Sequence, residues 1–203
     1  GHGGVTIGSE MASGVRNVLV ENCLFQDTDR GLRIKTRRGR GNLAVVDAIH
    51  FENVHMDKVM SPFVLNMFYF CDPDGHSDYV QNKDDIGAKV EDLPALKNFV
   101  FRNIRVKNAS LGGFFAYGLP EQPIESVLLE NITLEMLPVE QRLEGIPAMM
   151  DGEEWQKSQV IFAKNIEKLV MRNIEISGQE DDKIFLENVK EEVQEAVQLS
   201  TKS

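Results

Sequence analysis

Residues 29–43 of this 203-residue chain read DRGLRIKTRRGRGNL and concentrate positive charge. Between positions 30 and 40 lie six of the chain's 22 basic residues, namely Arg30, Arg33, Lys35, Arg37, Arg38 and Arg40. The whole chain carries a net charge of −10, so this segment is a cationic island in an acidic protein. A guanidinium holds a carboxylate through paired hydrogen bonds, and an ammonium holds it as a point charge. The residue types therefore indicate a pocket for an anionic ligand.

Two other interpretations of the basic segment compete with that pocket. A nucleic-acid surface needs a broad positive potential and usually stacking aromatic rings, whereas the acidic remainder of this chain would repel a long polyanion. We therefore expect no nucleic-acid partner. A solvated run of charges is the second alternative, and it stays open for Arg38 and Arg40. It suits Arg33 and Lys35 less well, because both fall on a predicted strand face.

Membrane and metal binding find little support in the sequence. No apolar run approaches the roughly 18 residues that span a bilayer, so we expect no membrane partner. The segment DPDGHSD at 72–78 gathers acidic residues and a histidine, but it lacks the spacing of a calcium loop. We expect neither a metal nor another cofactor.

An internal repeat is the strongest organisational signal in the chain. Its copies are VLVENCLF (18–25), IHFENVHM (49–56), FVFRNIRV (99–106), VLLENITL (127–134), LVMRNIEI (169–176) and a weaker IFLENVKE (184–191). The shared asparagines are Asn22, Asn53, Asn103, Asn131, Asn173 and Asn188. In the first five copies apolar residues alternate on each side of the asparagine and the alternation breaks there, as at a strand bend. We predict an all-β, right-handed parallel β-helix with a stacked asparagine ladder.

The residues that follow each repeat predict how neighbouring rungs stack. The expected neighbours are Ile7 with Ile34, Ile34 with Leu65, Leu65 with Phe115, Lys35 with Asn66, Arg33 with Val64, and Glu10 with Arg37. If Ile34 points inward, the alternation of a strand makes Arg33, Lys35 and Arg37 face outward on one side. The cations would then be arrayed along one strand of a rigid sheet.

The β-helix domain is predicted to cover residues 1–180, with a tail at 181–203. Two long polar insertions, 72–97 and 138–158, interrupt the repeat, and such loops often form groove walls or lids. In the tail, apolar residues recur at helical spacing, at Val189, Val193, Ala196 and Val197. That pattern favours a short amphipathic helix that caps the open end of the stack.

Several motifs together resemble the polygalacturonases of glycoside hydrolase family 28. They are GHG at 1–3, the following VTIGSE, and the tripeptide RIK at 33–35 on a rung repeat. The likeness extends to about residue 180, and the segment GSEMASGVRNV looks more like the bacterial exo-acting branch. The resemblance implies an oligo- or polysaccharide of α-1,4-linked galacturonate, as in pectin, hydrolysed with inversion.

The resemblance also implies roles for individual residues. His2 matches the GHG histidine, which orients the catalytic carboxylates in that family. Arg33 and Lys35 match the pair that holds the substrate carboxylate, and Tyr69 matches a substrate-contacting tyrosine more loosely. Asn66 and Arg37 join the expected substrate-binding set because they neighbour this pair on the predicted sheet.

The chain departs from the family pattern in its carboxylates. In these enzymes an N-x-D motif and a paired aspartate precede GHG, whereas here GHG stands at the start. The pairs Asp84–Asp85 and Asp181–Asp182 lack the strand context of the catalytic pair. Asp27 and Asp29 lie near the basic strand, where we expect them to pair with Arg30 or Arg33.

We therefore expect a C-terminal part of such a hydrolase, carrying the substrate-gripping half of the site. By itself it should lack hydrolase activity, and its exposed N-terminal rung should favour self-association. A non-catalytic β-helix that binds acidic glycans is the alternative. Endo or exo action, preference for homogalacturonan or rhamnogalacturonan, and cellular compartment stay open.

Overall fold

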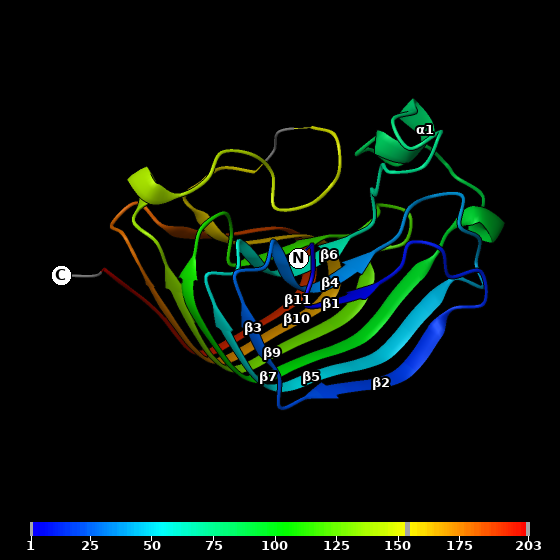
Figure 1. Ribbon diagram of the computed structural model, residues 1–203. Helices are drawn as coiled ribbons and strands as arrows, with labels where there is room; N and C mark the ends of the chain where they lie inside the picture. Colours follow the sequence, from blue (N-terminus) through cyan, green and yellow to red (C-terminus); the bar gives the residue numbers. More distant parts are fainter. Residues whose placement is uncertain (1, 153–154, 202–203) are drawn as a thin grey trace.

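A computed structural model describes residues 2–152 and 155–201, whose strands stack in parallel into a β-helix (Figure 1). The strands are β1 (Val5–Ile7), β2 (Val15–Glu21), β3 (Leu24–Gln26), β4 (Arg30–Lys35), β5 (Val45–Asp57), β6 (Ser61–Asn66), β7 (Ala95–Ala109), β8 (Phe114–Tyr117), β9 (Ile124–Met136), β10 (Gln159–Gly178) and β11 (Lys183–Thr201). The short helices are α1 (Asp78–Gln81), η1 (Val90–Asp92) and η2 (Val139–Gln141). The predicted all-β parallel β-helix is confirmed.

The long strand β10 joins two faces of the stack. Its residues 161–164 pair with β8, which continues the order β1-β4-β6-β8. Its residues 166–177 pair with β9, which continues the order β2-β5-β7-β9. The face built on β4 carries the RIK cations, so it is the face that positions the candidate site.

The core lies inside the coil and is apolar from rung to rung. Leu32 pairs in register with Phe63, and Phe63 with Phe114, and all three side chains are buried. The rings of Phe51 and Phe101 stack 5.3 Å apart on the other face. Removal of this apolar surface from water is the main stabilising term of the fold.

The rungs bend at residues with positive φ, a backbone conformation that asparagine tolerates better than most residues. On β7 the bends fall five residues apart, at Asn98, Asn103 and Asn108. The predicted asparagine ladder forms through side-chain hydrogen bonds between rungs. The side-chain amide of Asn103 donates to Asn53 at 3.1 Å. That of Asn131 donates to Asn103 at 2.9 Å, and that of Asn173 to Asn131 at 2.9 Å.

The prediction that Asn188 is the sixth member of this ladder is wrong. Asn188 donates to Asn165 at 3.1 Å, at a different bend, and Ala196 is the residue in register with Asn173. One rung contact was also misplaced by a residue, because Leu65 pairs with Ala116 and Phe115 pairs with Val64.

The predicted C-terminal helix is replaced by strand β11, which pairs with β10 along most of its length. The valines that indicated a helix instead contact one residue each on β10. Val189 is paired with Ile166, and Val193 with Val170. A spacing of four residues satisfies the helical period and the two-residue period of a strand equally, and the neighbouring rung decides between them.

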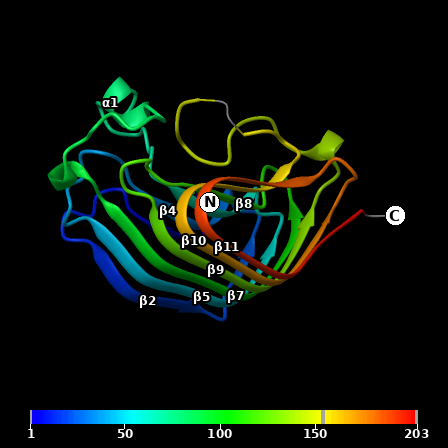
Figure 2. The same cartoon turned by 180° about the vertical axis from the view of Figure 1, so that it is seen from behind.

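The two insertions lie on the same side of the stack (Figures 1 and 2). The first is fastened by Arg38, whose fully buried guanidinium donates to the carbonyls of Asn82 at 2.7 Å and Asp84 at 3.2 Å and binds the carboxylate of Glu121 at 2.8 Å. The second is fastened by Arg142, which binds the buried carboxylate of Asp182 at 2.6 Å. The solvated interpretation of Arg38 is therefore wrong. Within the described ranges, no helix is long and apolar enough to cross a membrane.

Candidate carboxylate-binding site

The outward face of β4 presents Arg33 and Lys35 two residues apart. Their predicted neighbours are confirmed, since Arg33 pairs with Val64 and Lys35 with Asn66 on β6. Ile34, between the two cations, is fully buried in the core and pairs with Ile7 as predicted. The alternation of the strand thus holds both cations on the side where the insertions lie.

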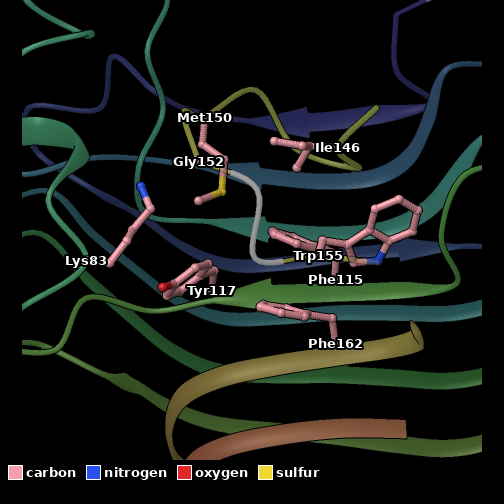
Figure 3. A pocket seen from close by; sticks show the side chains of 8 residues that line it. All are labelled: Lys83, Phe115, Tyr117, Ile146, Met150, Gly152, Trp155 and Phe162. Atoms are coloured by element: carbon pink, nitrogen blue, oxygen red, sulfur yellow. The ribbon is translucent and has the colours of Figure 1, made fainter. Parts of the chain in front are cut away.

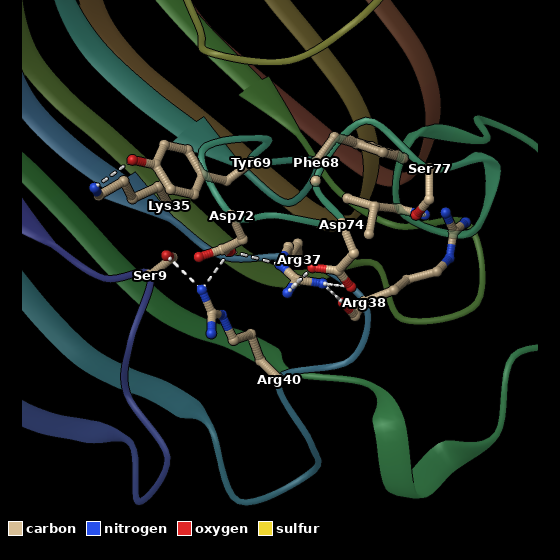
Figure 4. A network of polar contacts seen from close by, with 12 residues as sticks. Ser9, Lys35, Arg37, Arg38, Arg40, Phe68, Tyr69, Asp72, Asp74 and Ser77 are labelled. Atoms are coloured by element: carbon tan, nitrogen blue, oxygen red, sulfur yellow. Dashed lines mark hydrogen bonds and ion pairs between the residues drawn. The ribbon is translucent and has the colours of Figure 1, made fainter.

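Tyr69 lies directly beside Lys35 (Figure 4). The ammonium of Lys35 donates to the Tyr69 hydroxyl at 3.0 Å and lies 4.2 Å from the centre of its ring. Burial and then the charge of Arg33 lower the pKa of Lys35. Burial and then a hydrogen bond with Cys71 raise the pKa of Tyr69 to about 12, so the phenol stays neutral in ordinary buffers.

Arg33 is covered by the second insertion. Its side chain is 7% exposed, and Nη2 lies 2.7 Å from Sδ of Met149. The adjacent Arg30 donates from Nε to the carbonyl of Pro147 at 3.2 Å. Burial lowers the pKa of Arg33, and burial followed by the charge of Arg33 lowers the pKa of Arg30.

The buried Arg33 and the half-buried Arg30 and Lys35 differ from the buried Arg38 and Arg142 in their lack of a paired carboxylate among the described residues. Among the described residues, no aspartate or glutamate lies within ion-pair distance of Arg30, Arg33 or Lys35. Arg38 and Arg142, by contrast, each bind a buried carboxylate. A buried cation without a counter-charge is costly, and binding an anion would relieve that cost.

Two predicted site residues make their contacts within the protein. Asn66 is 1% exposed; its amide donates to the carbonyl of Met149 at 3.1 Å and accepts from the backbone of Phe68 at 2.8 Å. Arg37 donates to Asp72 at 2.7 Å and to Asp74 at 2.8 Å. Within the part of the chain that the structure describes, no hydrogen bond or ion pair joins Arg37 to Glu10, the neighbour expected for it. Asn66 and Arg37 both shape the loops around the site.

Asp72 is the centre of this loop network (Figure 4). Its carboxylate accepts from Arg37 and also from Arg40 at 2.5 Å, and Arg40 donates in addition to Ser9 at 2.9 Å. Burial raises the pKa of Asp72, but hydrogen bonds and charges from the two arginines outweigh it and leave the pKa lowered. Arg40 is thus an anchor of the first insertion and does not belong to a solvated charge run. In the described part of the chain no cluster of side chains suits a metal ion.

His2 lies at the exposed end of the same face. Its Nδ1 is 2.8 Å from Oδ2 of Asp29, and its side chain is 96% exposed. Asp29 was expected to pair with Arg30 or Arg33, but its hydrogen bond goes to His2. Gly1, the first residue of the GHG motif, lies outside the described residues.

Farther along the same face, aromatic rings line a small cavity under the second insertion (Figure 3). Phe115 and Phe162 stack with their centres 4.9 Å apart, and Tyr117, Trp155 and Met150 complete much of the wall. The volume is about 10 Å³, which is room for roughly one water molecule. This cavity is packing beneath a loop and is too small for a sugar ring.

Sequence reasoning missed two participants of the site, Arg30 and Met149. Strand alternation groups Arg30 with the core residues Leu32 and Ile34, so only its membership of the basic run pointed to it. Met149 could not be found from the sequence, because it lies 116 residues from Arg33 within an insertion that has no periodic pattern.

Comparisons with known proteins find one family model and several plant relatives similar to this chain. Residues 1–87 match the family model described as glycosyl hydrolases family 28. A probable polygalacturonase from Vitis vinifera is 24% identical over 132 residues, covering 65% of this chain and 24% of the relative. One from Arabidopsis thaliana is 30% identical over 139 residues, covering 66% and 28%. A polygalacturonase from Gossypium hirsutum is 33% identical over 139 residues, covering 66% and 31%.

This chain spans about a quarter to a third of the length of these curated relatives. No solved structure matches the chain. Residues 1–87 are therefore similar to glycosyl hydrolases family 28, and about two thirds of the chain is similar to part of these plant polygalacturonases.

Proposed function

We propose that this chain supplies the carboxylate-binding part of a polygalacturonase-like hydrolase, with galacturonate oligosaccharides as its ligand. The observation that carries the proposal is the pair Arg33 and Lys35, side by side on a rigid strand without a carboxylate partner among the described residues. The fork of Arg33 would bind both oxygens of a uronate carboxylate, and the Lys35 ammonium would add a point charge. Tyr69 holds that ammonium in place.

The same chain is proposed to bind its ligand without cleaving it. Inverting hydrolysis needs a carboxylic acid and a carboxylate roughly 6.5–9.5 Å apart, with water between the base and the sugar. The carboxylates bordering this face are already engaged, Asp29 with His2 and Asp72 with two arginines. In the complete site, His2 would orient the catalytic carboxylates, and the segment after GHG favours the exo-acting branch.

Calorimetric titration of trigalacturonate into the 203-residue chain, with a parallel assay for new reducing ends, tests this proposal. We expect binding without new reducing ends, and loss of binding in Arg33→Gln and in Lys35→Met. Arg105→Gln is a matched control, because Arg105 is an exposed arginine on β7 away from the RIK strand. Absence of binding to the unmodified chain would overturn the proposal. Turnover would place the catalytic carboxylates within this chain, and Asp29 would be the first to test.

The alternative, a β-helix that binds acidic glycans and never hydrolyses them, shares the same cations. It differs in what the encoding region upstream of Gly1 specifies. Rungs with an N-x-D motif and a paired aspartate there would favour the hydrolase, and rungs without them would favour the binding protein.

Self-association is a further part of the proposal. Strand β2 ends the strand order of its face, and an unpaired strand edge can pair with a second copy. Sedimentation of the chain at increasing concentration should show a rising mass, and a constant monomer mass would contradict this.

A further inference from the structure

Strand β2 at one end of the stack and strand β11 at the other are not complementary to each other (Figures 1 and 2). We propose that two copies of this chain associate through their β2 ends about a two-fold axis, and that the assembly closes at two chains. This inference rests on the proposed self-association and goes beyond it, because it names the contact surface and the final size. An unpaired edge alone would equally allow an open filament, with β11 of one copy on β2 of the next.

The inward-facing residues of the two ends differ in polarity. One column of the core is formed in register by Val18, Ile49, Phe99, Val127, Leu169 and Glu192. The next inward column is formed by Val20, Phe51, Phe101, Leu129, Met171 and Gln194. Both columns are apolar until the last rung, where β11 supplies a glutamate and a glutamine. Stacking β11 on β2 would therefore bury the charge of Glu192 against Val18, which offers it no hydrogen bond.

An outward column of charged residues opposes the same arrangement. Its members, in register, are Glu21, Glu52, Arg102, Glu130, Arg172 and Glu195. Within the stack Arg102 binds Glu52 at 3.2 Å, and Arg172 binds Glu195 at 3.0 Å. A copy with its β11 on β2 would instead place Glu195 directly beside Glu21. Like charges directly opposite each other on neighbouring strands are destabilising, so the filament is disfavoured.

The β11 end also disfavours a pair with itself. Residues 191–195 read EEVQE, and about a two-fold axis through this stretch its three glutamates would lie against those of the partner copy. That repulsion leaves the β2 end as the surface on which a second copy can dock.

The β2 end suits a second copy of itself. A two-fold axis normal to the sheet makes the two β2 strands antiparallel and keeps both interiors on one side. The half-buried Val18 and Val20 of each copy then meet apolar residues, and the exposed Leu19 lies at the middle of the contact. Arg16, at the start of one strand, comes beside Glu21, at the end of the other, and this happens twice. Both side chains are exposed, and within residues 2–152 and 155–201 neither forms an ion pair.

Sedimentation equilibrium over a concentration series tests the size and the contact. We expect the mean mass to rise to that of two chains and to stop there. Arg16→Glu and Glu21→Arg should each raise the Kd of the pair about tenfold, because like charges then meet at both ends of the paired strands. An equimolar mixture of the two variants should restore the pair, because each substituted residue then meets an opposite charge on its partner. Arg105→Glu, the same charge reversal on the inner strand β7, is the control and should change nothing.

Each contrary outcome has a distinct meaning. Masses above two chains would overturn the closed pair and show that β11 accepts a copy; Glu21→Arg would then strengthen association, because it would face Glu195. A mixture that fails to restore the pair, with both variants folded by circular dichroism, would overturn the antiparallel contact. A mass of one chain at every concentration would overturn this inference together with the proposed self-association. Trigalacturonate binding is measured separately, so the proposed carboxylate site would stand or fall on its own titration.

Discussion

Sδ of Met149 lies 2.7 Å from Nη2 of Arg33, so a neutral acceptor occupies the guanidinium best suited to a uronate carboxylate. The segment that carries Met149 is tied down on both sides of it, by Arg30 at Pro147 and by Gln81 at the backbone of Asp151. His76 adds a contact of 2.8 Å to the carboxylate of Asp151. The second insertion therefore covers Arg33, and a ligand has to displace Met149 to reach it.

Replacing Met149 with alanine should strengthen uronate binding. The variant removes a competing acceptor worth about 1 kcal/mol, so we expect about a fivefold lower Kd for trigalacturonate by calorimetry. Leu143→Ala, an exposed change in the same insertion, is the control and should have no effect. Weaker binding in Met149→Ala would mean that the methionine is part of the binding surface and does not compete with the ligand.

As pH rises, uronate binding should fall at a lower pH than that at which an ordinary lysine loses its proton. The pKa of Lys35 is lowered from 10.5, and only the protonated ammonium attracts a carboxylate. As pH rises through this lowered pKa, affinity should drop. Tyr69 does not interfere, because its pKa is about 12. Titrations across this range should show the drop in the unmodified chain and none in Lys35→Arg, whose charge persists. A pH-independent affinity in the unmodified chain would exclude Lys35 from the site.

Asp72→Asn should destabilise the loops around the site. The carboxylate of Asp72 is shared by Arg37 and Arg40, and removing one partner of a largely buried ion pair costs about 3 kcal/mol. Its folded pKa is lowered below 3.8, so its contribution is present at neutral pH and lost as pH falls through the folded value. The difference in Tm between the variant and the unmodified chain should therefore shrink in strong acid. Asp74→Asn, at a 61% exposed side chain, should cost less. Equal Tm values at neutral pH would contradict the network.

The rung architecture was predictable because physics ties it to a sequence pattern. A bend with positive φ favours asparagine, and the apolar alternation around it marks the core, so Asn53, Asn103 and Asn131 were found at once. The helix predicted for the tail failed because Val189 and Val193 suit both periods, and only stacking on β10 decides between them. The spacing of residues within the tail alone does not show whether it stacks on β10.

The residues of the candidate site likewise fall into those that the sequence pattern predicts and those that it does not. Arg33 and Lys35 were predictable because they lie on a rung whose alternation fixes their direction. Arg37 was expected on the same open surface, but it lies at the end of the rung, where loop carboxylates bind it. Contacts made by insertions depend on how long loops return over the sheet, and no spacing in the sequence encodes that return.

Ala196→Asn should stabilise the last rung. Ala196 has a φ of 53°, which asparagine tolerates better than alanine, and it faces Asn173 in register. The new amide would donate to the Asn173 side chain and extend the ladder, and we expect about 1 kcal/mol of stabilisation in a urea melt. Ala196→Asp is the matched control, since it tolerates the same backbone but has no donor. Equal stabilities of the two variants would show that the ladder contributes nothing at this position.

The candidate site is built partly from a strand of the stack and partly from two insertions. These two parts differ in how freely their side chains can be substituted. Arg33 is paired with strands on both sides and Lys35 with β6, so change there disturbs neighbouring rungs. Pro147 and Met149 belong to an insertion whose fastening by Arg142 and Asp182 lies elsewhere. Side chains of the insertion that do not pack into the core can therefore change at less cost to the stack than Arg33 or Lys35. Under the proposed function, changes in the insertion over the same cationic surface would alter which acidic glycan it accepts.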